Sequence, residues 1–165
     1  MTGIVNSTGA RSGVIGTTVG TPAVDAGKTV FSGWEADHNT TGDSYAYPEI
    51  DTFIQALDTD YATISGDTIT IVKAGYYFIH AQAHMHEDND TSRLMKIIID
   101  GTQKSFYTKV APEWETIATS YSSYLATDAV IAIGCKVGGT STPYAWHGME
   151  SPTYFSVCSL IFLGS

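Results

Sequence analysis

The sequence predicts an all-β protein built as a single domain. Gly, Thr, Ser, Ile, Val and Tyr are abundant while Leu and Lys are scarce, a composition that favours strands and turns. Short apolar runs alternate with turn residues, and no segment has the spacing of an amphipathic helix. The 165 residues are enough for one hydrophobic core. These observations predict a sandwich or jelly roll.

Strands are expected from residue 28 onward, each a run rich in β-branched and aromatic residues. The runs are 28–34, 51–57, 61–66, 68–73, 76–86, 93–100, 103–110, 116–126, 129–137 and 153–163. Turn residues separate them, as in EDND at 87–90. The pair Asp100–Gly101 between two runs predicts a tight hairpin.

Residues 1–27 are predicted to form an arm ahead of a jelly-roll domain at 28–165. The stretch MTGIVNSTGARSGVIGTTVGTP scatters Val and Ile among Gly, Thr and Ser, with no helical or sustained strand period. Such a segment cannot bury a face of its own, so it is either a flexible tail or a docking arm. The candidate docking residues are Ile4, Val5, Arg11, Val14, Ile15 and Val19.

The charge distribution argues against nucleic acid and anionic membrane as partners. The formal net charge is −9 and the pI is near 4.7, and the few cations form no basic run. The first residues lack a basic start followed by a long apolar run, so no Sec-type export signal is expected. No run approaches the ~18 apolar residues of a spanning helix.

Cys135 and Cys158 each lie in an apolar strand-like run. Their separation matches no zinc-ribbon spacing. They are expected to be buried thiols, which behave as small hydrophobic side chains, and a bridge between them is the alternative.

The stretch AGYYFIHAQAHMHE at 74–87 contains three closely spaced histidines. As a strand, it sends its two sets of side chains to opposite faces. One set is apolar: Tyr77, Ile79, Ala81, Ala83 and Met85. The other set is semi-polar and aromatic: Tyr76, Phe78, His80, Gln82, His84 and His86. The first predicts a core face, and the second is more typical of a subunit interface than of free surface.

This strand resembles the core strand of the C1q and tumour necrosis factor superfamily. The matching positions are Gly75, Tyr77, Ile79, Ala81 and Gln82. TYFSVCSLIFLGS at 153–165 is similar to the family's last strand, with Tyr154 and Phe155 at its aromatic pair, and 124–137 resembles the penultimate strand. The usual Gly-Asp before that strand is Thr127–Asp128 here. The resemblance covers roughly residues 28–165.

The resemblance implies a ten-stranded jelly roll that assembles as a three-fold homotrimer. By position, it places these residues at the trimer interface: Tyr76, Phe78, His80, Gln82, His84, Tyr154 and Cys158. It places Phe155, Val157 and Ile161 in the core. A Cys158 at the interface makes a bridge to Cys135 harder to form.

Three interpretations of the histidines remain open. In the first interpretation, the histidines are packed or hydrogen-bonded around the axis. Three copies of His80 or His84 offer a three-nitrogen site for a metal or anion. His84 and His86 also match the His-x-His of a cupin, another jelly roll, with Asp90 as the carboxylate ligand and His147 as the later histidine. No cofactor is expected under the first interpretation.

No catalytic motif is recognisable, so the chain is not expected to be an enzyme. The acidic loop EDND could hold Ca²⁺ but lacks the Gly-centred loop of an EF-hand. The loop aromatics could form a ligand patch or be buried beneath loops; they are Trp114, Tyr144, Trp146 and Tyr154.

The arm looks like segments of bacteriophage structural proteins that carry C1q-like domains. This resemblance implies a virion surface protein made in the host cytoplasm, a capsid decoration (cement) or head-fibre protein whose arm binds the major capsid protein or another virion protein. Alternatives are a tail-fibre tip that recognises the host surface and a secreted C1q/TNF-like ligand.

Overall fold

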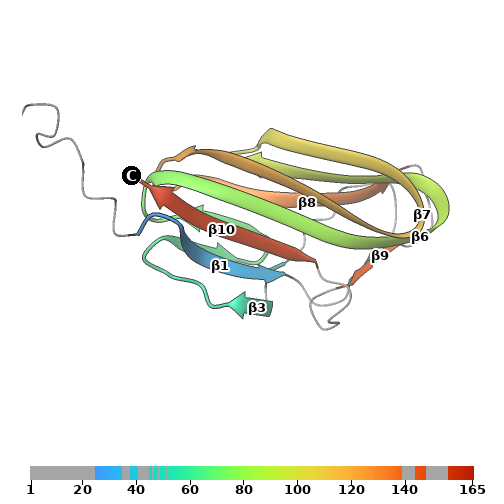
Figure 1. The fold of residues 1–165 in the computed structure, drawn as a ribbon, viewed down its shortest axis with the longest axis horizontal. Helices are drawn as coiled ribbons and strands as arrows, with labels where there is room; N and C mark the ends of the chain where they lie inside the picture. Colours follow the sequence, from blue (N-terminus) through green and yellow to red (C-terminus); the bar gives the residue numbers. More distant parts are fainter. Residues whose placement is uncertain are drawn as a thin grey trace, which may run out of the picture.

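The computed structural model describes residues 25–34, 38–40, 45, 47, 49–50, 52–138, 144–147 and 156–165. These residues contain strands and turns and no helix (Figure 1). The strands are β1 Lys28–Trp34, β2 His38–Thr40, β3 Thr52–Gln55, β4 Ala62–Ser65, β5 Thr68–Ile71, β6 Gly75–Ile99, β7 Thr102–Leu125, β8 Val130–Gly138, β9 Tyr144–His147 and β10 Val157–Gly164.

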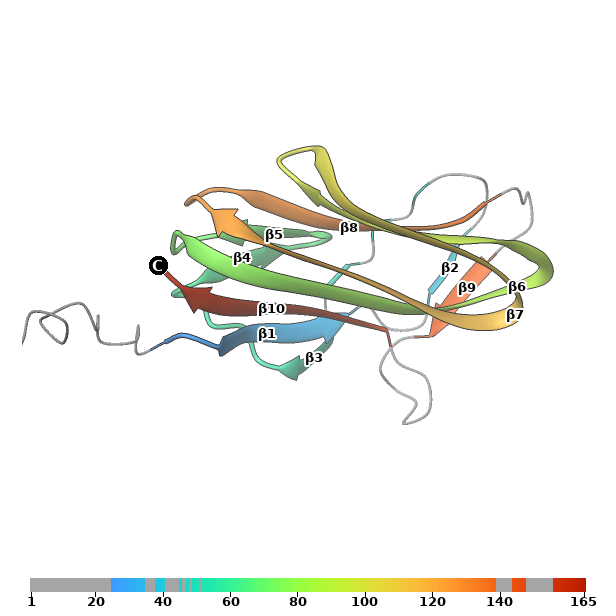
Figure 2. The same ribbon diagram turned by 45° about the horizontal axis from the view of Figure 1, so that its top comes forward.

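Two antiparallel sheets pack face to face and share the long strands β6 and β7 (Figures 1 and 2). The first sheet runs β3, β1, β10, the first half of β6 and the second half of β7. The second sheet runs β4, β5, β8, the second half of β6 and the first half of β7. A short β2–β9 pair continues from β6 at 84–86. The architecture is a jelly roll, as the sequence predicts.

The predicted turn at 87–90 is wrong, because β6 passes through it from one sheet into the other. The runs 76–86 and 93–100 are therefore one strand, and so are 103–110 and 116–126. The pairing register between β6 and β7 shifts between Glu87 and Thr91. Extra residues on one strand bend it, so this bulge turns both strands together.

The Asp100–Gly101 hairpin is confirmed. Asp100 has φ 50° and Gly101 has φ 72°, and two successive positive φ values are the signature of a type I′ turn. The turn places β7 directly against β6, with Ile99 opposite Thr102.

The core lies between the sheets and contains the apolar set predicted on β6. All five of these side chains are at most 1% exposed: Tyr77, Ile79, Ala81, Ala83 and Met85. From the second sheet, Met95, Ile97 and Ile131 meet them in the same cluster. The alternation of the sequence therefore identified the core side of β6 correctly.

Gly75 and Tyr77 have physical roles in the motif that carries the family resemblance. A Cβ on Gly75 would overlap Phe162 Cε2 and would lie 2.7 Å from the Gly164 carbonyl oxygen, so only glycine lets β10 approach this closely. The Tyr77 hydroxyl donates to the Lys73 carbonyl at 2.5 Å, and its ring meets Phe162 edge to face at 5.2 Å. The motif thus fixes the end of β10 against β6.

The two thiols are buried and not joined by a disulfide, as expected. Burial raises the pKa of the Cys158 thiol to about 12. Cys158 is therefore a protonated, apolar core residue at neutral pH.

Candidate functional site

The semi-polar set of β6 forms the centre of the outward face of the first sheet. Paired residues of antiparallel strands share a face, so the register gives the neighbours of each side chain. Tyr76 pairs with Tyr124, and His80 lies between Ser120 of β7 and Ser159 of β10. We call this surface the first-sheet face; it consists of Tyr76, Phe78, His80, Gln82, Ala118, Ser120, Ser122, Tyr124, Val157, Ser159 and Ile161.

No member of the first-sheet face carries a formal charge at neutral pH when its histidine is neutral. The whole chain contains 17 Asp and Glu and 8 Lys and Arg. Like charges repel, so the acidic surfaces of a chain with net charge −9 resist contact with a second copy. The first-sheet face lacks that repulsion.

Aromatic side chains give this face exposed apolar area. Tyr76 and Tyr124 are 54% and 53% exposed, and their rings meet edge to face with centroids 5.5 Å apart. The Phe78 and His80 rings are nearly parallel, with centroids 6.4 Å apart and an interplanar angle of 6°. Uncharged, aromatic-rich patches of this kind are typical of the core of protein interfaces.

His80 lies half-buried in the middle of the face. Burial lowers its pKa because it penalises the charged imidazolium. The ring is therefore neutral at pH 7 and suits an uncharged surface.

His84 was expected at the trimer interface, but it is buried within its own chain, where it is only 8% exposed. Its Nδ1 lies 2.7 Å from Thr116 Oγ1, and its backbone N–H donates to Ser156 Oγ at 3.1 Å. At this position β9 runs beside β6, with His147 opposite His84. A site built from three copies of His84 does not fit this arrangement, whereas His80 remains on the open face.

The described residues of one chain provide no cluster of metal ligands that would support the metal hypotheses. Among the described residues, no group of three or more His, Cys, Asp or Glu side chains could hold a metal ion. The side chains of His86, Asp90 and the later His147, which the cupin interpretation needs, lie outside what the structure describes.

The prediction that Cys158 faces the interface is wrong. Cys158 is fully buried, and its pairing with Ala81 places it on the core side of β10. Val157 and Ile161, expected in the core, are only partly buried and lie on the first-sheet face. A shift of one residue reverses every side chain of a strand, and the assumed alignment contains that shift.

Several predicted residues lie outside the described part of the chain. They are the interface residue Tyr154, its neighbour Phe155 and the arm residues Ile4, Val5, Arg11, Val14, Ile15 and Val19. The side chains of Trp114, Tyr144 and Trp146 are not described either. Their predicted roles stay predictions.

Two features were missed by the sequence reasoning. Arg93 is fully buried on the core side of β6, and its position in the alternation of RLMKIIID could have revealed this. Strand β7 pairs only with β6 among the described strands, so it is the edge of both sheets. Its first half exposes Phe106, Tyr107 and Val110.

A charged cluster fixes the point at which the chain enters the fold. Lys73 Nζ lies 2.8 Å from Asp25 Oδ2 and 3.2 Å from the Tyr61 hydroxyl. The Gly27 N–H donates to the Phe162 carbonyl at 2.8 Å. The hydrogen bond from Lys73 lowers the pKa of Asp25, and the same contact raises the pKa of Lys73. Residue 25 is thereby held beside the end of β10.

Comparison with solved structures identifies the fold. Murine APRIL at pH 8.0 superposes with a TM-score of 0.57 and 12% identity over 82% of this chain and 98% of that chain. Eiger TNF from S. frugiperda superposes with a TM-score of 0.58 and 11% identity over 83% of this chain and 94% of that chain. The fold is a TNF-like jelly roll.

No family model matches the sequence, and no curated protein matches it. At 10–12% identity the structural similarity concerns the fold and not the activity. The described residues contain no helix long and apolar enough to cross a membrane.

Proposed function

We propose that the protein is a non-enzymatic homotrimer that assembles through the first-sheet face. The observation that carries this proposal is the absence of charge on an exposed, aromatic-rich face of a strongly acidic chain. The resemblance of β6 to the core strand of the C1q/TNF superfamily supports the same face, since the trimer implied by that resemblance buries it.

A closed ring of three copies needs two different complementary surfaces on each copy. The first-sheet face is one of them. The second is the β7 edge, where Phe106, Tyr107 and Val110 are exposed beside backbone groups that pair with no further described strand. An exposed hydrophobic edge strand is otherwise an aggregation hazard, and covering it in the trimer removes that hazard.

The trimer is proposed to serve as a phage virion surface protein, a capsid decoration or head-fibre protein. The arm at 1–27 would bind the major capsid protein or another virion protein, which places the trimer on the virion surface. The composition of the arm supports this role, as does the charged cluster that holds Asp25 to the fold. The alternative of a TNF-like ligand is favoured by the fold shared with APRIL and Eiger.

The assembly is tested by measuring molar mass with light scattering across a range of concentrations. The expected mass is three times that of the 17.7-kDa chain. A monomer at all concentrations would remove the basis of the proposal.

The attachment role is tested by deleting residues 1–22 and measuring incorporation into particles of the encoding virus. The truncated protein is expected to remain a folded trimer and to be absent from purified particles. Unchanged incorporation would contradict the role of the arm. Electron microscopy of labelled particles then distinguishes a capsid position from a tail position.

A further inference from the structure

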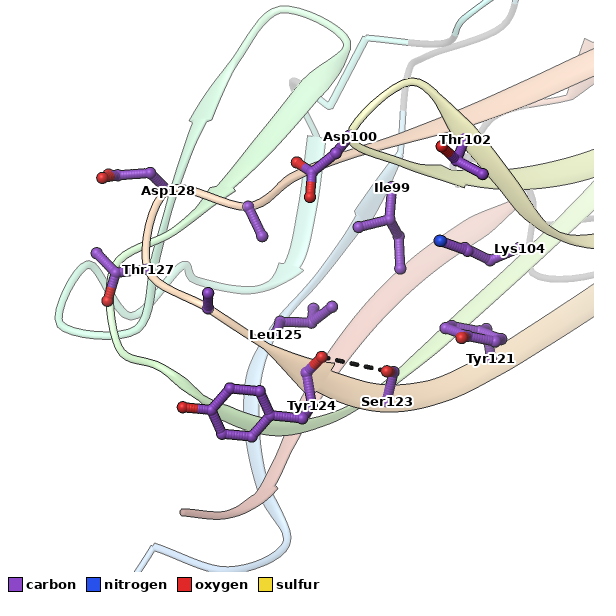
Figure 3. A pocket seen from close by; sticks show the side chains of 12 residues that line it. Ile99, Asp100, Thr102, Lys104, Tyr121, Ser123, Tyr124, Leu125, Thr127 and Asp128 are labelled. Carbon is purple, nitrogen blue, oxygen red and sulfur yellow. Dashed lines mark hydrogen bonds between the residues drawn. The ribbon is translucent and has the colours of Figure 1, made fainter.

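A polar groove opens at the end of the molecule where two turns meet the β7 edge. It lies between the Asp100–Gly101 hairpin and the turn at 126–129 that joins β7 to β8, and its volume is about 480 Å³ (Figure 3). This volume is within the range of small-molecule sites.

Hydrogen bonds hold the two turns in fixed positions. Asp100 Oδ1 accepts the Val130 N–H at 2.9 Å, and the Asp100 N–H donates to the Val130 carbonyl at 2.9 Å. The Asp128 N–H donates to the Ile71 carbonyl at 2.8 Å, which fastens the second turn to β5. A groove with fixed walls loses little conformational entropy on binding a ligand.

Lys104, in the wall of this groove, differs from every other cation in the described part of the chain. Three lysines form ion pairs: Lys28 with Asp58, Lys73 with Asp25 and Lys109 with Glu115. Lys96 and Lys136 lie near the Tyr45 ring, and Arg93 is buried with partners of its own. Among the described residues, Lys104 has no such partner, and Figure 3 shows its side chain directed toward the middle of the groove.

The other lining groups suit a ligand with many hydroxyls. Thr102 and Tyr121 supply hydroxyls, whereas the Ser123 and Thr127 hydroxyls already donate to the Tyr124 and Val72 carbonyls. Ile99, Leu125 and Ala129 supply apolar surface. Sugars present hydroxyls and C–H patches together, so they match such a mixed lining. Tyr121 pairs with the core residue Ile79, and Ser123 pairs with the core residue Tyr77, so both lining residues lie on the inward side of β7.

The charge balance selects among anionic ligands. The lining contains one ammonium group, that of Lys104, and two carboxylates, those of Asp100 and Asp128. Both a phosphate dianion and a sugar carboxylate would meet these two like charges, but the carboxylate carries about half the charge, so it is repelled less while it still pairs with Lys104.

We propose that this groove binds a sugar acid, with the sugar carboxylate on Lys104 and sugar hydroxyls on Tyr121, Thr102 and the Asp100 carboxylate. This site is separate from the attachment arm, although its lining residue Tyr124 also belongs to the first-sheet face, and binding can be measured on the purified protein. It would give the head a ligand-recognition function in addition to assembly.

The test compares sugar acids with neutral sugars of the same shape. Methyl glucuronide and methyl galacturonide are titrated beside methyl glucoside and methyl galactoside, with protein NMR shifts as the readout. At least one acid is expected to bind about tenfold more tightly than its neutral partner, as a charge-assisted hydrogen bond contributes. No preference for either acid would overturn the proposal.

Matched variants locate the binding. Lys104→Gln is expected to abolish the preference for the acid, and Tyr121→Phe is expected to weaken the acid and the neutral sugar alike. Lys109→Gln removes the same charge from the same strand outside the groove and should keep the preference. If Lys104→Gln binds like the wild type, or if Lys109→Gln loses the preference equally, the assignment to this groove is wrong.

Discussion

The two halves of β6 share one core and present different outward surfaces. The first half turns Tyr76, Phe78 and His80 outward on a face without charge. The second half turns Lys96 outward, and its Nζ lies 3.5 Å from the centroid of the Tyr45 ring. One face is therefore open and uncharged, while the other carries a cation that the chain itself covers.

The difference in outward charge between the two halves of β6 distinguishes a candidate interface from an ordinary surface, whereas the burial of their core sides does not. The core sides of the two halves are equally apolar, with Tyr77 and Ile79 in one and Met95 and Ile97 in the other. Only the outward sets differ in charge and in what covers them. The comparison therefore predicts that equal changes on the two halves have unequal effects.

The largest expected difference follows from placing a charge on each outward face. Phe78→Asp should convert the proposed trimer to a monomer, because three buried carboxylates near one axis would repel one another and lose their hydration. Light scattering should then give the 17.7-kDa chain mass.

Ile98→Asp is the matched control, since Ile98 is a partly buried outward residue of the second half of the same strand. This variant should remain a trimer. Equal dissociation of both variants would mean that the first-sheet face has no special role in assembly.

The next effect contrasts one glycine in each sheet. Gly75→Ala should lower the free energy of unfolding by about 1–3 kcal/mol, because the new Cβ would overlap Phe162 and the Gly164 backbone. Gly134→Ala should cost less than about 1 kcal/mol, because its nearest neighbour is the flexible Lys96 side chain, at 2.7 Å. Denaturant unfolding measures both.

If the two alanine variants lose equal stability, the close approach of β10 to Gly75 does not constrain the fold. The comparison is best made at one protein concentration, since an assembled protein gains stability from assembly.

The sequence predicted the core side of β6, the jelly-roll class and the Asp100–Gly101 hairpin, because alternation and turn chemistry are local signals. It failed at 87–90, where acidic residues that resemble a turn instead form a bulge in a continuous strand. It also failed for Cys158, because an apolar run such as SVCSLIFL has no polar alternation to fix its register. The groove at Lys104 depends on two turns that meet only in the folded chain, so no local pattern reveals it.

A smaller effect is expected from protonation of His80. Burial within the single chain already lowers the pKa of His80, and the further burial expected in the proposed trimer would lower it again, so the dissociated chain binds the proton more readily. Assembly should not depend on His80 above about pH 6.5, the ordinary value for histidine, and it should weaken as the pH falls below the lowered pKa of the dissociated chain. Sedimentation at pH 8 and pH 5 measures the change.

His80→Gln keeps a polar side chain and removes this titration, so its assembly should vary less between the two pH values. An unchanged pH dependence in His80→Gln would assign the effect to another group.

The smallest effect is expected on the outward side of the second half of β6, where Lys96 lies over the Tyr45 ring. Lys96→Gln removes the cation above Tyr45 and should lower the free energy of unfolding by about 0.5–1 kcal/mol, the usual range for an exposed cation–π contact. Lys136→Gln is the control, since its Nζ lies 5.8 Å from the same ring and should contribute less. Both variants should remain trimers, because neither residue lies on the first-sheet face. If Lys96→Gln instead dissociated the trimer, the second-sheet face would take part in assembly, and the contrast between the two halves of β6 would have to be abandoned.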